Sequence, residues 1–143
     1  MPPSLDQARV ALAAQPFSHL LGAQLNRFGP DGVELEVPVR PAHRQQHGFA
    51  HGGLLGCAAD NALTFAAGAV AGPEVLTAGY TINVLAPVLG DRLLARAWVS
   101  SAGQRLIVTR CELVEPHPDG DRLSAIAHGT IARTTYIAGL GVG

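Results

Sequence analysis

The residues best suited to chemistry begin at His51-Gly52-Gly53, directly before a long apolar stretch. If that stretch is a helix, its first backbone N–H groups have no partner within the helix and carry partial positive charge. Glycine lets another molecule approach those groups closely, so this turn is suited to polarising a carbonyl oxygen, as an oxyanion hole does. The alternative is an ordinary glycine-containing helix start without a chemical role.

Asp60 is the second candidate, because it is the only charged side chain between Arg44 and Glu74. A carboxylate in apolar surroundings loses much of its hydration energy unless it is paired. Asp60 is therefore a candidate general base or nucleophile. The alternative is a buried aspartate that is hydrogen-bonded to a neighbouring helix.

The spacing of these two candidates has a geometric consequence. Asp60 follows Gly52 by eight residues, which corresponds to about 12 Å along one helix. A single ester or thioester carbonyl therefore cannot contact Gly52 and Asp60 of the same chain. If the two residues cooperate, two antiparallel copies of the helix must face each other, and the chain must act as a homodimer.

Several other patterns give weaker signals. His43, His47 and His51 are spaced four apart, but Gly48 interrupts them and no acidic residue lies nearby, so no metal site is predicted. Cys57 has no activating neighbour in the sequence, and small buried cysteines are common. The GxSxG nucleophile elbow of α/β-hydrolases is absent from the sequence.

The element that must position Gly52 and Asp60 is a predicted helix over 52–71, which is dominated by Ala and Leu. Its length also suits a membrane span, but Asp60 and Asn61 near its middle favour a helix enclosed by its own protein. One sheet from the same chain cannot cover so apolar a helix on every side, which is a second reason to expect a partner copy.

The rest of the chain predicts strands and one short helix. A turn at Gly29-Pro30-Asp31-Gly32 precedes an alternating strand over 33–37. Ser4 is expected to cap a helix in the lead-in segment 1–16, and 137–143 to form a flexible tail. One α+β domain over residues 1–143 is predicted. Further strands, expected as successive antiparallel neighbours, lie around Leu25 and over 76–85, 93–99, 106–114 and 122–135.

Composition argues against several protein classes. Hydrophobic residues make up 48% of the 143 residues, charged residues only 15%, and mean hydropathy is +0.22, so disorder is not expected. The net charge of -1 and the absence of a basic run argue against a nucleic-acid partner. Two cysteines without CxxC spacing, and no signal-peptide pattern at the start of the sequence, predict a cytoplasmic protein.

Two motifs together resemble those of PaaI-like acyl-CoA thioesterases, which have the hotdog fold. The first is HGG with an acid nine residues after the histidine, and the second is a strand of the form T-x-x-Y-x-I-N-x-L-x-P. The resemblance implies a curled antiparallel sheet wrapped around one long central helix, and hydrolysis of an acyl-CoA to free acid and CoA. The segments that carry it are QQHGFAHGGLLGCAADNALTFAAG and TAGYTINVLAPVLGD, and the likeness extends over about 17–134.

The resemblance also implies roles for individual residues. Asp60 matches the catalytic carboxylate of the family, and Gly52 matches the position whose N–H holds the thioester oxygen. Six residues before the histidine the family usually has an asparagine that orients substrate or water. This chain has Gln45 there, one methylene longer, and Gln46 could share its role. Thr77 aligns with a serine or threonine that assists the acid in some members.

Substrate contacts follow from the same resemblance. His51 and Gly53 shape the turn that receives the substrate, and Leu54, Leu55 and Phe65 are expected to line an apolar pocket for a medium, long or aromatic acyl group. Similar proteins are homodimers or homotetramers built as dimers of dimers. They need no metal or redox cofactor, because coenzyme A arrives as part of the substrate. Neither nucleic acid nor a membrane is expected as a partner.

Two other functions remain open from the sequence. The first is a non-catalytic hotdog module that binds an acyl-CoA or a lipid. The second is a hotdog hydratase or dehydratase acting on acyl thioesters. Enzymes of that kind commonly pair a histidine with an acid, and the predicted helix carries Asp60 without a histidine.

Overall fold

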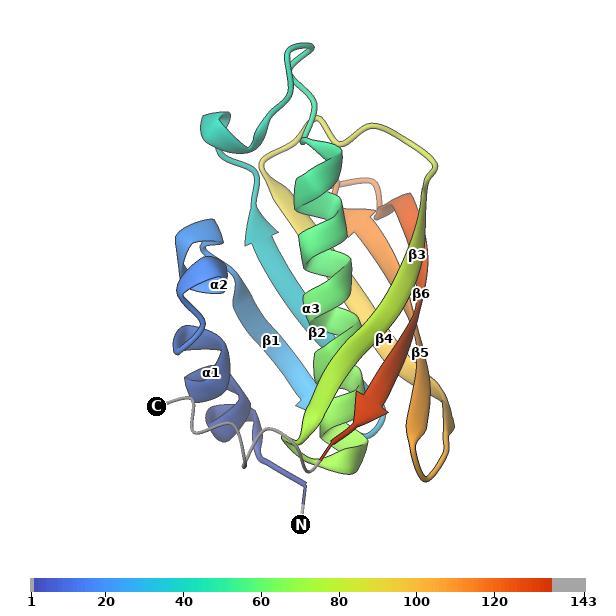
Figure 1. Ribbon diagram of the computed structural model, residues 1–143. Helices are drawn as coiled ribbons and strands as arrows, with labels where there is room; N and C mark the ends of the chain where they lie inside the picture. Colours follow the sequence, from blue (N-terminus) through green and yellow to red (C-terminus); the bar gives the residue numbers. More distant parts are fainter. Residues whose placement is uncertain (1, 135–143) are drawn as a thin grey trace.

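A computed structural model describes residues 2–134 of the chain, so the predicted tail over 137–143 lies outside the described residues. A six-stranded antiparallel sheet curls around one long helix, α3 (Gly52–Ala71), as Figure 1 shows. The predicted hotdog arrangement is confirmed. The strands are β1 (Gln24–Gly29), β2 (Gly32–Pro38), β3 (Val75–Val84), β4 (Arg92–Ala102), β5 (Leu106–Glu115) and β6 (Arg122–Arg133), and a short 3-10 helix, η1, spans Pro41–His43.

The strand order in the sheet is β1-β2-β4-β5-β6-β3. The expectation of successive neighbours is correct for β1–β2 and for β4–β5–β6, but it is wrong for β3, which pairs with β6 at the far edge. The reason is that α3 crosses the concave face of the sheet and delivers the chain to the opposite edge. The following connection then returns the chain to pair β4 with β2.

Helix α3 has a buried side and an open side. Leu63 is 0% exposed and packs on the concave face of the sheet. The opposite stripe, which carries Cys57, Asp60, Asn61 and Thr64, is only half-buried. Among residues 2–134, α3 is the one helix long and apolar enough to span a membrane, and 56% of its most apolar window is buried inside the protein. Core packing of this kind accounts for its apolar composition.

Two helices precede the sheet, α1 (Leu5–Ala13) and α2 (Pro16–Leu21). The predicted cap at Ser4 is confirmed, because its hydroxyl accepts from Gln7 N at 3.2 Å while Gln7 Oε1 accepts from Ser4 N at 2.8 Å. Arg9 Nε donates to the carbonyl of Leu25 in β1 at 3.0 Å. Helix α1 therefore covers the β1 edge of the sheet.

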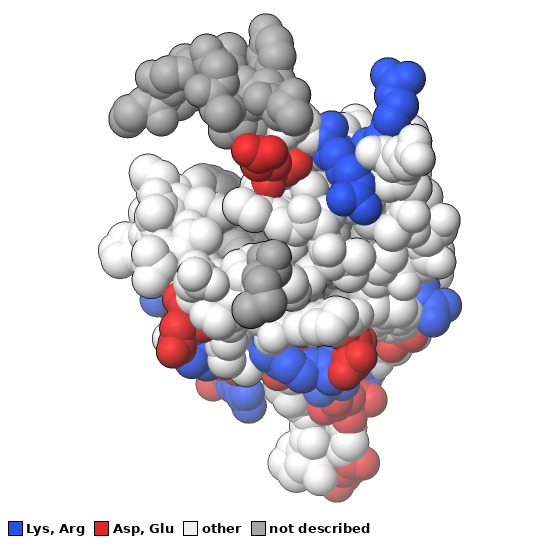
Figure 2. All heavy atoms as spheres, turned by 90° about the horizontal axis from the view of Figure 1, so that it is seen from below, with Lys and Arg blue, Asp and Glu red and all other residues white. Residues whose placement is uncertain are grey.

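Charges are sparse on the molecular surface. Figure 2, a view from below, shows scattered charged side chains with broad uncharged areas between them. On the outer side of the sheet, Arg92 pairs with Glu36 at 3.0 Å and Arg96 pairs with Glu34 at 2.8 Å, which joins β2 to β4.

Candidate active site

The Asp60 carboxylate is held by a threonine hydroxyl. Thr77, on β3, donates to Asp60 Oδ1 at 2.7 Å. Thr64 lies one helical turn after Asp60, and its Oγ1 is 2.7 Å from Thr77 Oγ1 and 2.8 Å from the Asp60 carbonyl oxygen. Each hydroxyl can donate one hydrogen bond. Thr77 donates to the Asp60 carboxylate, and Thr64 donates either to Thr77 Oγ1 or to the Asp60 carbonyl oxygen. No ion pair to Asp60 occurs within residues 2–134.

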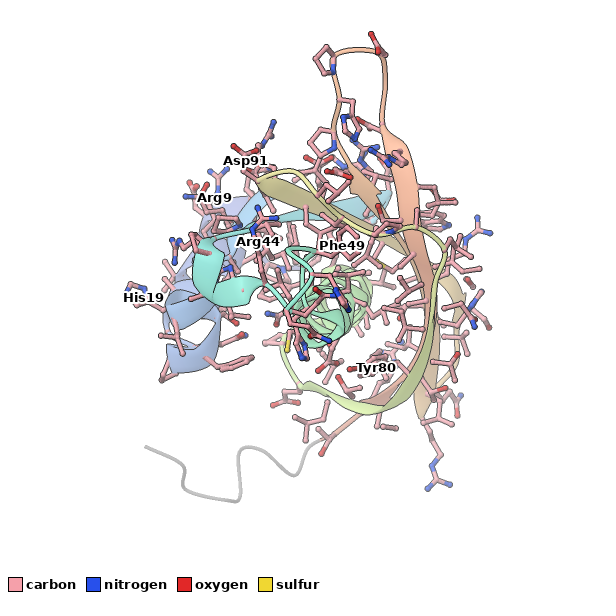
Figure 3. All side chains as sticks on the ribbon, turned by 90° about the horizontal axis from the view of Figure 1, so that it is seen from above. Arg9, His19, Arg44, Phe49, Tyr80 and Asp91 are labelled. Carbon is pink, nitrogen blue, oxygen red and sulfur yellow. The ribbon has the colours of Figure 1, made fainter. Side chains whose placement is uncertain are left out.

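Cys57 and Tyr80 lie beside this carboxylate. Burial, and then the charge of Asp60, raise the pKa of the Cys57 thiol, so it stays protonated near neutral pH and is a poor nucleophile. Burial first, and then Asp60 and Cys57, raise the pKa of the Tyr80 phenol. Figure 3 shows Tyr80 on the inner side of β3, and a Cβ added to Gly56 would lie 3.2 Å from its hydroxyl oxygen.

The start of α3 offers a free donor. His51 is the N-cap, and its Nδ1 accepts from Gly53 N at 2.8 Å. The carbonyl of His51 accepts from Leu54 N at 2.9 Å. The N–H of Gly52 has no acceptor among the described residues, and a Cβ added there would meet nothing within 4 Å. Among the described residues the Gly52 N–H is therefore an unpaired donor, and it lies at the positive end of a 20-residue helix.

Gln45 shares a cavity of about 290 Å³ with Gly52, and the other lining residues are Phe49, Ala50, Leu55 and Val84 to Val88. The Oε1 atom of Gln45 accepts from His47 N, so the amide NH₂ is the half of the side chain that remains available. Gln46 is exposed and does not line the cavity. Leu54 is buried in the core, whereas Leu55 lines the cavity.

A second cavity, of about 360 Å³, lies beside Thr64 on the open side of α3. Phe65 lines it together with Phe28, and the two rings meet edge-on with centroids 6.2 Å apart. Gln7, Ala8 and Ala11 of α1 form the opposite wall. No residue lines both this cavity and the one that contains Gly52, so the two cavities are separate.

A family model described as the thioesterase superfamily matches residues 47–120, just over half of the chain. The chain belongs to this superfamily. The match begins in the loop that carries the candidate donor and extends through α3 and β3, so it includes Gly52, Asp60 and Thr77.

Solved members of the superfamily have the same fold. A thioesterase family protein from Silicibacter pomeroyi is 33% identical over 87% of this chain and 93% of its own, with a TM-score of 0.81. The phenylacetic acid degradation protein PaaI from Thermus thermophilus is 30% identical over 84% of this chain and 100% of its own, with a TM-score of 0.75. A curated Mycobacterium tuberculosis relative, provisionally named as an esterase, is 39% identical over 54 residues, which span 39% of its length.

Thr64 and Tyr80 lie beside Asp60, and the sequence did not predict a role for either residue. Thr64 could have been found from its position four residues after Asp60, on the same helical face. Tyr80 is part of the strand motif, but the motif alone does not indicate a role for it. No metal site was predicted at His43, His47 and His51. In the structure the His43 ring hydrogen-bonds to Pro38 O, and the His51 ring accepts from Gly53 N. Across residues 2–134 no three His, Cys, Asp or Glu side chains converge to hold a metal ion.

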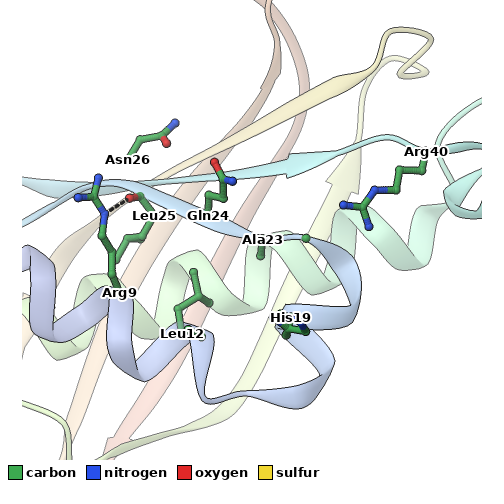
Figure 4. Close-up of a pocket in the computed structure, with 10 residues that line it drawn as sticks. Arg9, Leu12, His19, Ala23, Gln24, Leu25, Asn26 and Arg40 are labelled. Atoms are coloured by element: carbon green, nitrogen blue, oxygen red, sulfur yellow. Dashed lines mark hydrogen bonds between the residues drawn. The ribbon is translucent and has the colours of Figure 1, made fainter.

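A further cavity of about 740 Å³ lies between the N-terminal helices and β1, as Figure 4 shows. Arg9, His19 and Arg40 line it, but neither Gly52 nor Asp60 does. It is therefore separate from the two cavities described above.

Proposed function

We propose that this superfamily member hydrolyses an acyl-CoA thioester to a free acid and CoA, at a site shared between two copies of the chain. The observation that carries this proposal is the Asp60 carboxylate, held through one oxygen by Thr77 and lacking a cation partner among the described residues. A carboxylate of this kind can accept a proton from water. The Gly52 N–H, which has no acceptor among the described residues, supplies the complementary donor. In this proposal each chain therefore carries two half-sites, one at Asp60 and one at Gly52.

In the proposed reaction, the thioester oxygen binds the Gly52 N–H of one protomer, beside the amide NH₂ of Gln45. The partner's Asp60 takes a proton from water while the water oxygen bonds to the carbonyl carbon. The tetrahedral intermediate then breaks its C–S bond, and the CoA thiolate takes up the proton. Direct attack by Asp60, through a mixed anhydride that water hydrolyses, gives the same products. One oxyanion donor typically contributes about 3 kcal/mol to such a barrier.

The acyl group is proposed to occupy the cavity between α1, β1 and α3 of the protomer that supplies Asp60. Its volume of about 360 Å³ falls at the lower end of the range for small-molecule sites. Phe28 and Phe65 give it an apolar, partly aromatic wall, which suits a medium-chain or aromatic acyl group. The Thermus thermophilus relative, a phenylacetic acid degradation protein, supports the aromatic choice. No cofactor is proposed beyond the CoA of the substrate.

The test is release of CoA from a panel of short, medium, long and aromatic acyl-CoAs by the wild type and Asp60→Asn. We expect turnover by the wild type and a loss of about 100-fold or more in a variant that is still folded. Asp119→Asn, in an exposed turn, is the matched control and should keep full activity. A blank without substrate corrects for the two protein thiols.

The other outcomes separate the competing functions. Saturable acyl-CoA binding without CoA release would identify a binding module. Addition of water to an enoyl-CoA would identify a hydratase. Equal turnover by the wild type and Asp60→Asn would keep the reaction but remove Asp60 from it.

A further inference from the structure

The connection between β3 and β4 contains a turn, Leu89-Gly90, whose two carbonyl groups face one cation. Arg44 donates through Nη1 to Leu89 O at 3.1 Å and through Nη2 to Gly90 O at 2.9 Å. The same guanidinium donates to Gly48 O at 2.8 Å and to Val39 O at 3.0 Å. Arg44 is half-buried. One side chain therefore ties together three backbone segments.

The opposite side of the turn faces an anion. Glu115, at the end of β5, is 1% exposed, and its Oε1 accepts from Leu89 N at 3.2 Å and from Gly90 N. The guanidinium of Arg122 and the imidazole of His117 lie 3.6 Å and 3.4 Å from Glu115 Oε2. A Cβ on Gly90 would lie 2.6 Å from Glu115 Oε1, so only glycine allows this approach.

The peptide group between Leu89 and Gly90 is therefore aligned between opposite charges. Its oxygen points to Arg44 and its N–H points to Glu115. Charge-assisted hydrogen bonds are about twice as strong as neutral ones, and bonds through one peptide group reinforce each other. The turn is fixed from both sides far more firmly than an ordinary surface connection.

This turn adjoins one wall of the cavity that contains Gly52 and Gln45. Val84 to Val88 form that wall, and the loop that contains Gln45, Phe49 and Ala50 forms the other. Ala50 N donates to Val88 O at 2.9 Å, and Arg44 joins Gly48 of the loop to Leu89 and Gly90 of the opposite side. Arg44 and Glu115 do not line the cavity themselves.

We infer that Arg44 and Glu115 are positioning residues for the reaction, which set the distance between the two walls of the Gly52 cavity and so place the Gln45 amide relative to the Gly52 N–H. The inference rests on the proposed function. Arg44 is required as arginine, because lysine offers no planar fork that can reach four carbonyl oxygens. The effect falls on the transition state, where the distance between donors matters most, and therefore on kcat more than on KM.

Chemical rescue tests this role. Arg44→Ala is expected to lose about tenfold or more in kcat with KM changed less than threefold, and about 20 mM guanidinium, far below denaturing concentrations, to restore at least a third of the lost kcat. Urea, a neutral molecule of similar shape, should not restore it, and Arg44→Lys should remain impaired. Glu115→Gln should lower kcat without response to guanidinium. Arg110→Ala, which removes a guanidinium stacked 4.6 Å above the Trp98 ring, is the matched control and should match the wild type.

Hydrogen exchange separates failure of the positioning role from failure of the proposed function. Exchange at Gly48, Ala50, Leu89 and Gly90 should rise in Arg44→Ala and fall again with guanidinium, whether or not the wild type hydrolyses any acyl-CoA. A folded Arg44→Ala with wild-type kcat, or with a kcat loss that guanidinium leaves unchanged, would overturn the positioning role. An inactive wild type with the expected exchange pattern would support the positions that Arg44 and Glu115 give to the two walls and contradict the proposed hydrolysis.

Discussion

At the scale of single residues, Gly52 is a position where a backbone N–H can be removed with little other change to the structure. It is the first residue of α3, and a side chain there meets nothing within 4 Å. Proline is well tolerated at the first helical position, where the N–H has no intrahelical partner. His51 precedes it with φ -62 and ψ 138, a conformation that residues before proline prefer. The donor can therefore be deleted without breaking the helix.

We predict that Gly52→Pro lowers kcat by about 100-fold or more, the usual effect of removing one oxyanion donor. Gly52→Ala adds the same first carbon but keeps the N–H, so the difference between the two variants isolates the donor. The measurement is steady-state CoA release, with circular dichroism to check that α3 is intact. Equal activities for the proline and alanine variants would exclude the Gly52 N–H as a donor.

Single residues were predictable where a motif fixed them, and not where the fold brought separate segments together. Asp60, Gly52 and Thr77 stand in the two motifs, and the structure places Thr77 against Asp60 across a separation of 17 residues. Gln45 was predicted only as a residue that orients substrate or water, and the structure places it in the cavity that contains Gly52. The hydrogen bond that its Oε1 atom accepts within the loop was not predictable, because it depends on a local backbone turn. Arg44 gave no sequence signal, because its partners are backbone carbonyls.

At the scale of elements, α3 was predictable because Ala and Leu dominate its length and no proline interrupts it, and its bounds match the prediction. The place of β3 was not predictable from spacing. The distance between two strands in the sequence limits their connection but does not choose an edge of the sheet.

Helix α1 provides the element-scale prediction, because its residue Ala11 is exposed and lines the proposed acyl cavity. Ala11→Phe should fill part of that cavity without disturbing the core. Excluding two methylenes from an apolar site costs about 1.6 kcal/mol, so kcat/KM for the longest accepted acyl-CoA should fall by about tenfold while the shortest is unaffected. Val10→Phe, at a position 70% exposed and outside the cavity, is the control. A uniform loss across all chain lengths would place the acyl group elsewhere.

At the scale of the whole molecule, the two half-sites belong to one reaction only if two chains combine. Gly52 and Asp60 are separated by about 12 Å along α3, and no residue lines both cavities. A shared site makes a prediction that a site within one chain does not make. Two inactive variants, each defective in a different half, can restore one intact site in a mixed dimer.

Mixing Gly52→Pro with Asp60→Asn, under conditions that exchange subunits, should recover about a quarter of wild-type activity. Half of the dimers are then mixed, and each mixed dimer has one intact and one doubly defective site. The recovered activity should follow the fraction of mixed dimers, measured by native mass spectrometry. No recovery in a sample that contains mixed dimers would show that the site lies within one chain.

The two edge strands of the sheet, β1 and β3, differ in what covers them. Helix α1 lies over the β1 edge, and Arg9 donates a hydrogen bond to the carbonyl of Leu25. At β3, no further strand follows within the described residues. Pairing through β3 would join two sheets and leave only covered β1 edges at the ends, and covered edges do not recruit more strands. Assembly by this route is self-terminating, so a chain with a 10-residue open edge strand can pair once and still avoid growing into a fibre.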